Sequence, residues 1–170
     1  MKLPLSLPLL ISACLFSMSA YGQASYATYG YGCGNRGEPP VPAQIIVMGT
    51  PRLGTTIDIS WNGPTFTRRY SVLANLVTGL SRTSYFCQPL PIHIPSWMLN
   101  FTGENCELWC SVEAMEILGT RNSIPIDIPL NSHLIGLKLY HQWYLRYVVT
   151  GSFLDVFTLL SDGGEMTIGL

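Results

Sequence analysis

The stretch GLKLYHQWYLRYVV, residues 136–149, alternates mostly apolar with polar side chains over residues 137–147. Successive side chains of a β-strand point to opposite faces. One face would carry Leu137, Leu139, His141, Trp143, Leu145 and Tyr147. The other would carry Lys138, Tyr140, Gln142, Tyr144 and Arg146. The first face is mostly apolar, so the pattern predicts a long strand that packs Trp143 in a core and turns its second face to solvent.

Shorter alternating runs follow each other along the rest of the chain, separated by Gly, Pro and Asp turn signals. We expect strands near residues 44–48, 55–61, 68–77, 90–95, 106–112, 122–130, 153–160 and 165–170. VEAMEILG, residues 112–119, has neither the caps nor the length of a convincing helix. Eight or nine short antiparallel strands indicate an all-β fold, a single β-sandwich or jelly-roll domain with disulfides.

Two turns between these strands are predicted from their glycines. GTPRLG, residues 49–54, suits a reversal because Gly permits positive φ and Pro fixes its own φ. SDGG, residues 161–164, predicts a hairpin, since Asp-Gly between two alternating runs is a strong turn signal. That hairpin would point Met166 and Ile168 inward.

The composition favours an all-β protein and disfavours nucleic-acid binding. Only 11% of the residues are charged, whereas 48% are hydrophobic, and the chain holds 16 Gly and 12 Pro. Nine Lys and Arg stand against ten Asp and Glu. No basic surplus is therefore available to neutralise phosphates.

The first residues resemble a secretory signal. Lys2 precedes an apolar run to about Met18, and small residues follow, which predicts cleavage before Gln23 or, nearly as well, before Ser25. We assign residues 1–22 to the signal and 23–170 to one domain, with no transmembrane segment in the mature chain. A lipoprotein interpretation of ISAC, with Cys14 lipidated, is disfavoured because apolar residues continue beyond it. The protein is expected to be secreted or held at the cell surface.

Removal of the signal leaves four cysteines, Cys33, Cys87, Cys106 and Cys110. An even number in an exported protein favours disulfides, and four cysteines allow three pairings. Cys106 and Cys110 lie close in one expected strand, where they could bond each other only across a sharp bend. We choose Cys33–Cys106 and Cys87–Cys110. A single C-x3-C spacing without a nearby His disfavours zinc, so no metal and no cofactor are expected.

Several short motifs resemble a group of secreted bacterial modules. The chain contains YGYGC at residues 29–33, GTPRLG at 49–54, LYHQWYL at 139–145, and a closing SDGGEMTIGL. This pattern is similar to short secreted modules of aquatic bacteria with large secretomes, which carry Y-G-x-G-C, G-x-P-x-L-G and L-x-x-Q-W. The resemblance spans residues 29–170 except for about 80–105. It implies export and a β-sandwich, and it implies no particular activity.

Aromatic and polar side chains supply the candidate ligand-binding residues. Tyr140, Gln142, Tyr144 and Arg146 could stack on and hydrogen-bond a sugar, although a solvated sheet face is the favoured explanation. Trp97 and Phe101, in a loop-like segment, form a second candidate patch, with packing over a sheet edge as the alternative.

No catalytic set is recognisable in the sequence. His93, His133 and His141 share no metal-binding spacing, and neither H-E-x-x-H nor G-x-S-x-G occurs. We therefore expect a non-catalytic module for adhesion or polysaccharide contact, whose partner is a polysaccharide or another surface protein. A structural subunit of a surface layer or fibre, with edge-to-edge oligomers, is the first alternative. A small secreted hydrolase is the second.

Overall fold

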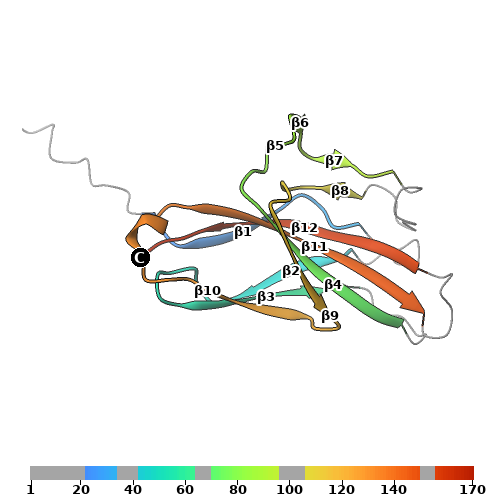
Figure 1. The fold of residues 1–170 in the computed structure, drawn as a ribbon, viewed down its shortest axis with the longest axis horizontal. Coiled ribbons are helices and arrows are strands. Elements are labelled where there is room, and N and C mark those ends of the chain that lie inside the picture. Colours follow the sequence, from blue (N-terminus) through green and yellow to red (C-terminus); the bar gives the residue numbers. More distant parts are fainter. Residues whose placement is uncertain (1–21, 34–41, 64–69, 96–105, 150–155) are drawn as a thin grey trace, which may run out of the picture.

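The computed structural model describes residues 22–33, 42–63, 70–95, 106–149 and 156–170. Within them, eight strands form two antiparallel sheets that share one core (Figure 1). The five-stranded sheet has the order β1 (Ser25–Tyr29), β12 (Val156–Thr167), β11 (Lys138–Val149), β4 (Tyr70–Gly79) and β9 (Ala114–Gly119). The three-stranded sheet has the order β10 (Ser123–Asp127), β3 (Thr56–Asn62) and β2 (Gln44–Met48). The predicted all-β sandwich is confirmed.

The core forms where the inward faces of the two sheets meet. In β3, Ile57 and Ile59 are fully buried while Asp58 between them is exposed, as a period of two requires. In β11, Trp143 is fully buried, as predicted, and its indole N–H donates to the carbonyl of Ser60 in the opposite sheet at 3.0 Å. That bond satisfies the buried donor and joins the two layers.

The closing segment is one strand, so the predicted SDGG hairpin is wrong. β12 runs through residues 161–164 and pairs with β11 on one side and with β1 on the other. A Cβ on Gly163 would lie 2.6 Å from the Tyr29 ring, and one on Gly164 would lie 2.1 Å from the Tyr26 hydroxyl. Glycine is present here because two tyrosine rings pack against the strand from opposite faces. Met166 and Ile168 are buried, as expected.

A bulge in β12 lies beside the centre of β11. Gln142 pairs with Gly163, but Tyr144 pairs with Leu160, so β12 contains one extra residue. The Ser161 hydroxyl accepts from the Trp143 N–H at 2.9 Å and donates to the Asp162 carbonyl at 2.7 Å. The Asp162 carboxylate accepts from the backbone N–H of Ile45 at 2.6 Å. The bulge thus links β12 to β2 in the other layer.

The predicted GTPRLG turn joins β2 to β3. Gly49 and Gly54 have φ values of 102° and 73°, which side-chain-bearing residues rarely adopt. The Leu53 N–H donates to the Gly169 carbonyl at 3.0 Å, and the Gly169 N–H donates to the Pro51 carbonyl at 3.0 Å. The turn therefore fastens the three-stranded sheet to the C-terminal end of the chain.

The segment between β4 and β9, which we call the outer segment (residues 80–95 and 106–113), lies outside the five-stranded sheet (Figure 1). It contains the two-residue strands β5 (Ser84–Tyr85), β6 (Gln88–Pro89), β7 (Ile92–His93) and β8 (Glu107–Leu108). The disulfide Cys33–Cys106 joins its second half to the segment that follows β1, which confirms that pairing. A bridge across 73 residues contributes about 4 kcal/mol by the loop-entropy estimate.

Candidate functional site

The predicted ligand-binding face of β11 is covered at Tyr140 and Gln142. Gln142 is fully buried and Tyr140 is only 9% exposed, so the expectation of a solvated face is wrong for this part of the strand. The Gln142 Oε1 accepts from the Trp109 N–H at 2.9 Å, and its Nε2 donates to the carbonyls of Glu107 at 2.8 Å and Ser161 at 2.7 Å. The side chain binds the outer segment to the sheet and has no free group for a ligand.

Aromatic rings complete this attachment. Tyr29 makes edge-to-face contacts with Trp109 and Tyr140, at centroid distances of 6.2 and 6.4 Å. The Arg82 guanidinium lies 5.6 Å above the Tyr29 ring and 3.1 Å from a carboxylate oxygen of Glu165. Two of the four residues that suggested a sugar platform, Tyr140 and Gln142, thus bind the outer segment to the sheet.

The other four predicted binding residues are Tyr144, Arg146, Trp97 and Phe101. Tyr144 is half-buried and Arg146 is exposed on β11. Trp97 and Phe101 lie outside the described residues. Their part in ligand binding stays a prediction.

The predicted disulfide Cys87–Cys110 is wrong, because the two thiols occupy different environments. Cys87 is exposed at the tip of the β5–β6 hairpin, where Phe86 and Cys87 have φ values of 45° and 63°. Cys110 is buried in a small cluster with Val77 and Tyr140. Burial raises the pKa of the Cys110 thiol to about 12, so it is protonated and unreactive at neutral pH.

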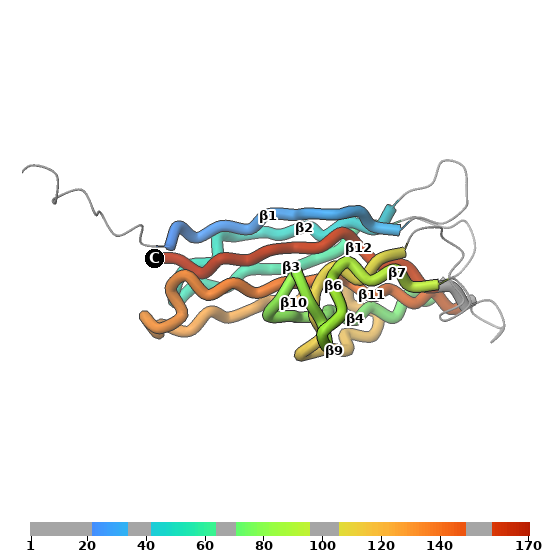
Figure 2. Tube along the Cα trace, turned by 90° about the horizontal axis from the view of Figure 1, so that it is seen from above, coloured from blue at the N-terminus to red at the C-terminus, as the bar shows by residue number. Residues whose placement is uncertain are grey.

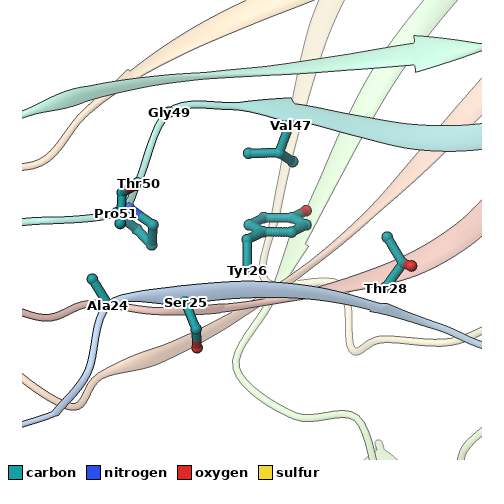
Figure 3. A pocket seen from close by; sticks show the side chains of 8 residues that line it. All are labelled: Ala24, Ser25, Tyr26, Thr28, Val47, Gly49, Thr50 and Pro51. Atoms are coloured by element: carbon teal, nitrogen blue, oxygen red, sulfur yellow. The ribbon is translucent and has the colours of Figure 1, made fainter.

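A hollow of about 450 Å³ opens between β1 in one layer and β2 in the other. Its lining residues are Ala24, Ser25, Tyr26, Thr28, Val47, Gly49, Thr50 and Pro51 (Figure 3). Tyr26 from β1 and Val47 from β2 point toward each other across it. Hydroxyl groups are the only polar side-chain groups in this lining, which includes no carboxylate, imidazole, thiol or amine. The hollow can therefore receive an apolar or hydroxyl-bearing group, and its lining offers no general acid–base pair.

The hollow lies between the two layers, because β1 and β2 belong to different sheets, and hydrogen bonds from β12 and from the C-terminal end of the chain cross between the layers near its two ends. At one end, Asp162 bonds the backbone of Ile45. At the other, Gly169 exchanges hydrogen bonds with Leu53 and Pro51. Figure 2 shows β1 and β2 along the same side of the molecule. We call this side, formed by β1, β2 and the hollow between them, the open side.

Tyr26, which lines the hollow, lies against the buried side chain of His141. The rings of Tyr26 and His141 are stacked, with centroids 6.0 Å apart and an interplanar angle of 16°. The Tyr26 hydroxyl and both ring nitrogens of His141 have no hydrogen-bond partner. Burial lowers the pKa of His141 to about 4 and raises that of Tyr26 above its ordinary value. At neutral pH both side chains are therefore uncharged, as a core position requires.

The two strands that border the hollow are unprotected sheet edges. In the part of the chain that the structure describes, no strand pairs with the free side of β1 or of β2. Their sequences, SYATY and QIIVM, contain no charged residue. Ile46 and Met48 on β2 are 42% and 67% exposed. Natural sheet edges usually carry charges, prolines or covering segments that prevent pairing with other chains.

The opposite edges of both sheets carry such protection. β9 contains Glu116, and β10 contains Pro125 and Asp127, all exposed. The sequence shows that residues 25–29 and 44–48 are uncharged, but which strands lie at an edge depends on the sheet order. Sequence reasoning missed the open side for this reason.

In comparisons with known proteins, no family model, no curated protein and no solved structure matches the chain. Among the described residues, no helix has the length and apolar character needed to cross a membrane. The same residues contain no group of three or more His, Cys, Asp or Glu arranged to hold a metal ion.

Proposed function

We propose that the protein is an exported, non-catalytic β-sandwich module that acts in adhesion or assembly at the cell surface or in the extracellular matrix. The observation that carries this proposal is the open side. There, two uncharged sheet edges border a hollow whose lining offers no acid–base chemistry. Such a side suits binding to another chain through backbone hydrogen bonds and apolar contacts.

The burial of Tyr140 and Gln142 favours a protein partner over a polysaccharide. Carbohydrate contact calls for accessible rings beside polar groups, yet Tyr140 and Gln142 are buried beneath the outer segment. Edge strands instead present alternate backbone N–H and C=O groups, which an extended segment of another protein can pair with. The buried disulfide Cys33–Cys106 is in keeping with an oxidising location outside the cytosol.

A hydrolase is less well supported. His141 is fully buried, and its ring nitrogens contact no carboxylate or hydroxyl that could orient them for proton transfer. The hollow places only hydroxyl-bearing and apolar side chains around its walls.

The test is retention of the purified, oxidised protein on cell envelopes isolated from cells that export it. We expect retention on untreated envelopes and on envelopes oxidised with periodate, and loss of retention after the envelopes are digested with protease. Loss after periodate alone would reassign the partner to a polysaccharide, and Trp97→Ala would then show whether the predicted loop patch takes part. No retention on untreated envelopes would contradict the proposal.

A further inference from the structure

We propose that the open side receives a second copy of this chain, with β1 pairing antiparallel to β1 of that copy about a twofold axis. This inference rests on the proposed function and names its partner. In a twofold dimer the same surface serves both subunits, so it must be complementary to itself. The open side meets that requirement in its charge, in its backbone groups and in the position of its two edges.

The absence of charge on β1 and β2 favours the open side as the surface through which two copies pair. A strand that pairs with its own copy places identical residues opposite or diagonal to each other, and like charges there are destabilising. β1 and β2 carry no charge, whereas β9 would place Glu116 near its own copy and β10 would do the same with Asp127. The whole chain has a net charge of −1, so two copies repel each other little.

The backbone of β2 offers hydrogen-bonding groups at the same side. The Ile45 N–H points away from β3, since it donates to Asp162 across the gap between the layers. Backbone groups alternate in direction along an antiparallel pair, so the groups of Val47, two residues on, also point away from β3. Val47 is half-buried and faces the hollow, which leaves its backbone beside the opening.

The position of the two edges lets one twofold axis serve both layers. β1 ends the five-stranded sheet and β2 ends the three-stranded sheet, and both lie along one side of the molecule (Figure 2). An axis perpendicular to the layers would extend the larger sheet through β1 and bring the two β2 strands together. The exposed side chains of Ile46 and Met48 would then be buried, and the two hollows would close against each other.

Light scattering coupled to size-exclusion chromatography of the exported, oxidised protein, over a series of concentrations, tests this pairing. We expect a concentration-dependent dimer. Ala27→Lys, at the middle of β1, and Met48→Lys, on exposed β2, should each raise the dissociation constant by roughly tenfold or more, because like charges then face each other across the axis. Met115→Lys is the matched control, since Met115 is 52% exposed on the opposite edge strand β9 and should leave the dimer unchanged.

A monomer at every concentration would overturn the inference, as would a dimer that Met115→Lys disrupts and Met48→Lys does not. Met48 is largely exposed, so its replacement keeps the test decisive even where Ala27→Lys prevents folding. Envelope retention separates the two proposals: a monomer that is retained leaves the proposed function standing, and loss of retention in wild type contradicts that function whatever its oligomeric state.

Discussion

Two tyrosines of β1 occupy opposite faces of the sheet and differ in their hydrogen bonding. The buried Tyr26 hydroxyl has no partner, while the Tyr29 hydroxyl donates to the Trp109 carbonyl at 3.2 Å. Tyr26→Phe should therefore be neutral or raise the free energy of unfolding by up to about 1 kcal/mol, and Tyr29→Phe should lower it by about 1 kcal/mol. Urea denaturation of both variants measures this difference. Equal losses in the two would show that Tyr26 has a partner.

His141 makes stability depend on pH in a defined direction. Its pKa is about 4 in the folded protein, against an ordinary value of 6.5. Between these values the unfolded chain binds a proton that the folded protein does not, so stability is full above about pH 6.5 and falls as the pH is lowered toward 4. The loss approaches about 3 kcal/mol and levels off below pH 4.

The variant His141→Phe isolates this contribution, because the carboxylates titrate in both proteins. Unfolding free energies measured from pH 7 to pH 4 should fall more steeply in wild type than in His141→Phe. Parallel curves would mean that His141 gains solvent or a partner in the folded protein.

At the scale of elements, Gln142 holds the outer segment against β11. Its replacement by Leu leaves the Trp109 N–H and the carbonyls of Glu107 and Ser161 without their partner. We expect a loss of about 3 kcal/mol in unfolding free energy and faster amide exchange in residues 106–113, because buried groups lose their hydrogen bonds. Gln88→Leu, at an exposed position of β6, is the control and should change neither. An outer segment that exchanges as in wild type would contradict this role.

The outer segment also determines the thiol content of the protein. Cys87 is exposed and Cys110 is buried, so a thiol reagent should label one cysteine in the native oxidised protein and a second only after unfolding. Cys87→Ser should remove the first reaction and keep the second. If no thiol reacts with the reagent after unfolding without reductant, Cys87 and Cys110 are bonded to each other, which contradicts this prediction.

Individual strands could be predicted from the sequence because their signals are local. The alternation in TIDISWN and the apolar face around Trp143 place Ile57, Ile59 and Trp143 in the core, where the structure has them. A two-residue period, however, reports only which side chains share a face. It does not say that the outer segment covers the polar face of β11 at Gln142. The pattern therefore predicts a solvated Gln142, although backbone groups of Trp109, Glu107 and Ser161 satisfy its amide.

The glycines of SDGG show the same limit. Asp-Gly is a turn signal when nothing crowds the strand, but Gly163 and Gly164 are glycines because Tyr29 and Tyr26 press against them. Both tyrosines lie in β1, at the other end of the chain, and no local pattern connects them to residues 163–164. Glycine is required both where a turn needs positive φ and where an aromatic ring packs directly on the backbone. Only the tertiary structure shows which of these two reasons applies.

At the scale of the whole molecule, the open side follows from sheet order. β1 and β2 are neighbours in sequence but end different sheets, so each leaves a free edge on the same side. The order of strands depends on how residues far apart in the sequence pair. The sequence therefore predicted β2 as a strand, but it predicted neither the strand β1 nor the site that β1 and β2 border.

The most direct measurement of the central claim is backbone amide exchange at low and at high protein concentration. If copies join through the open side, amides in residues 25–29 and 44–48 should exchange more slowly at high concentration, because new strand pairing protects them. Residues 114–119 of β9, also at a sheet edge, should exchange equally at both concentrations. Exchange in β1 and β2 that does not change with concentration, or new protection in β9 instead, would contradict the account.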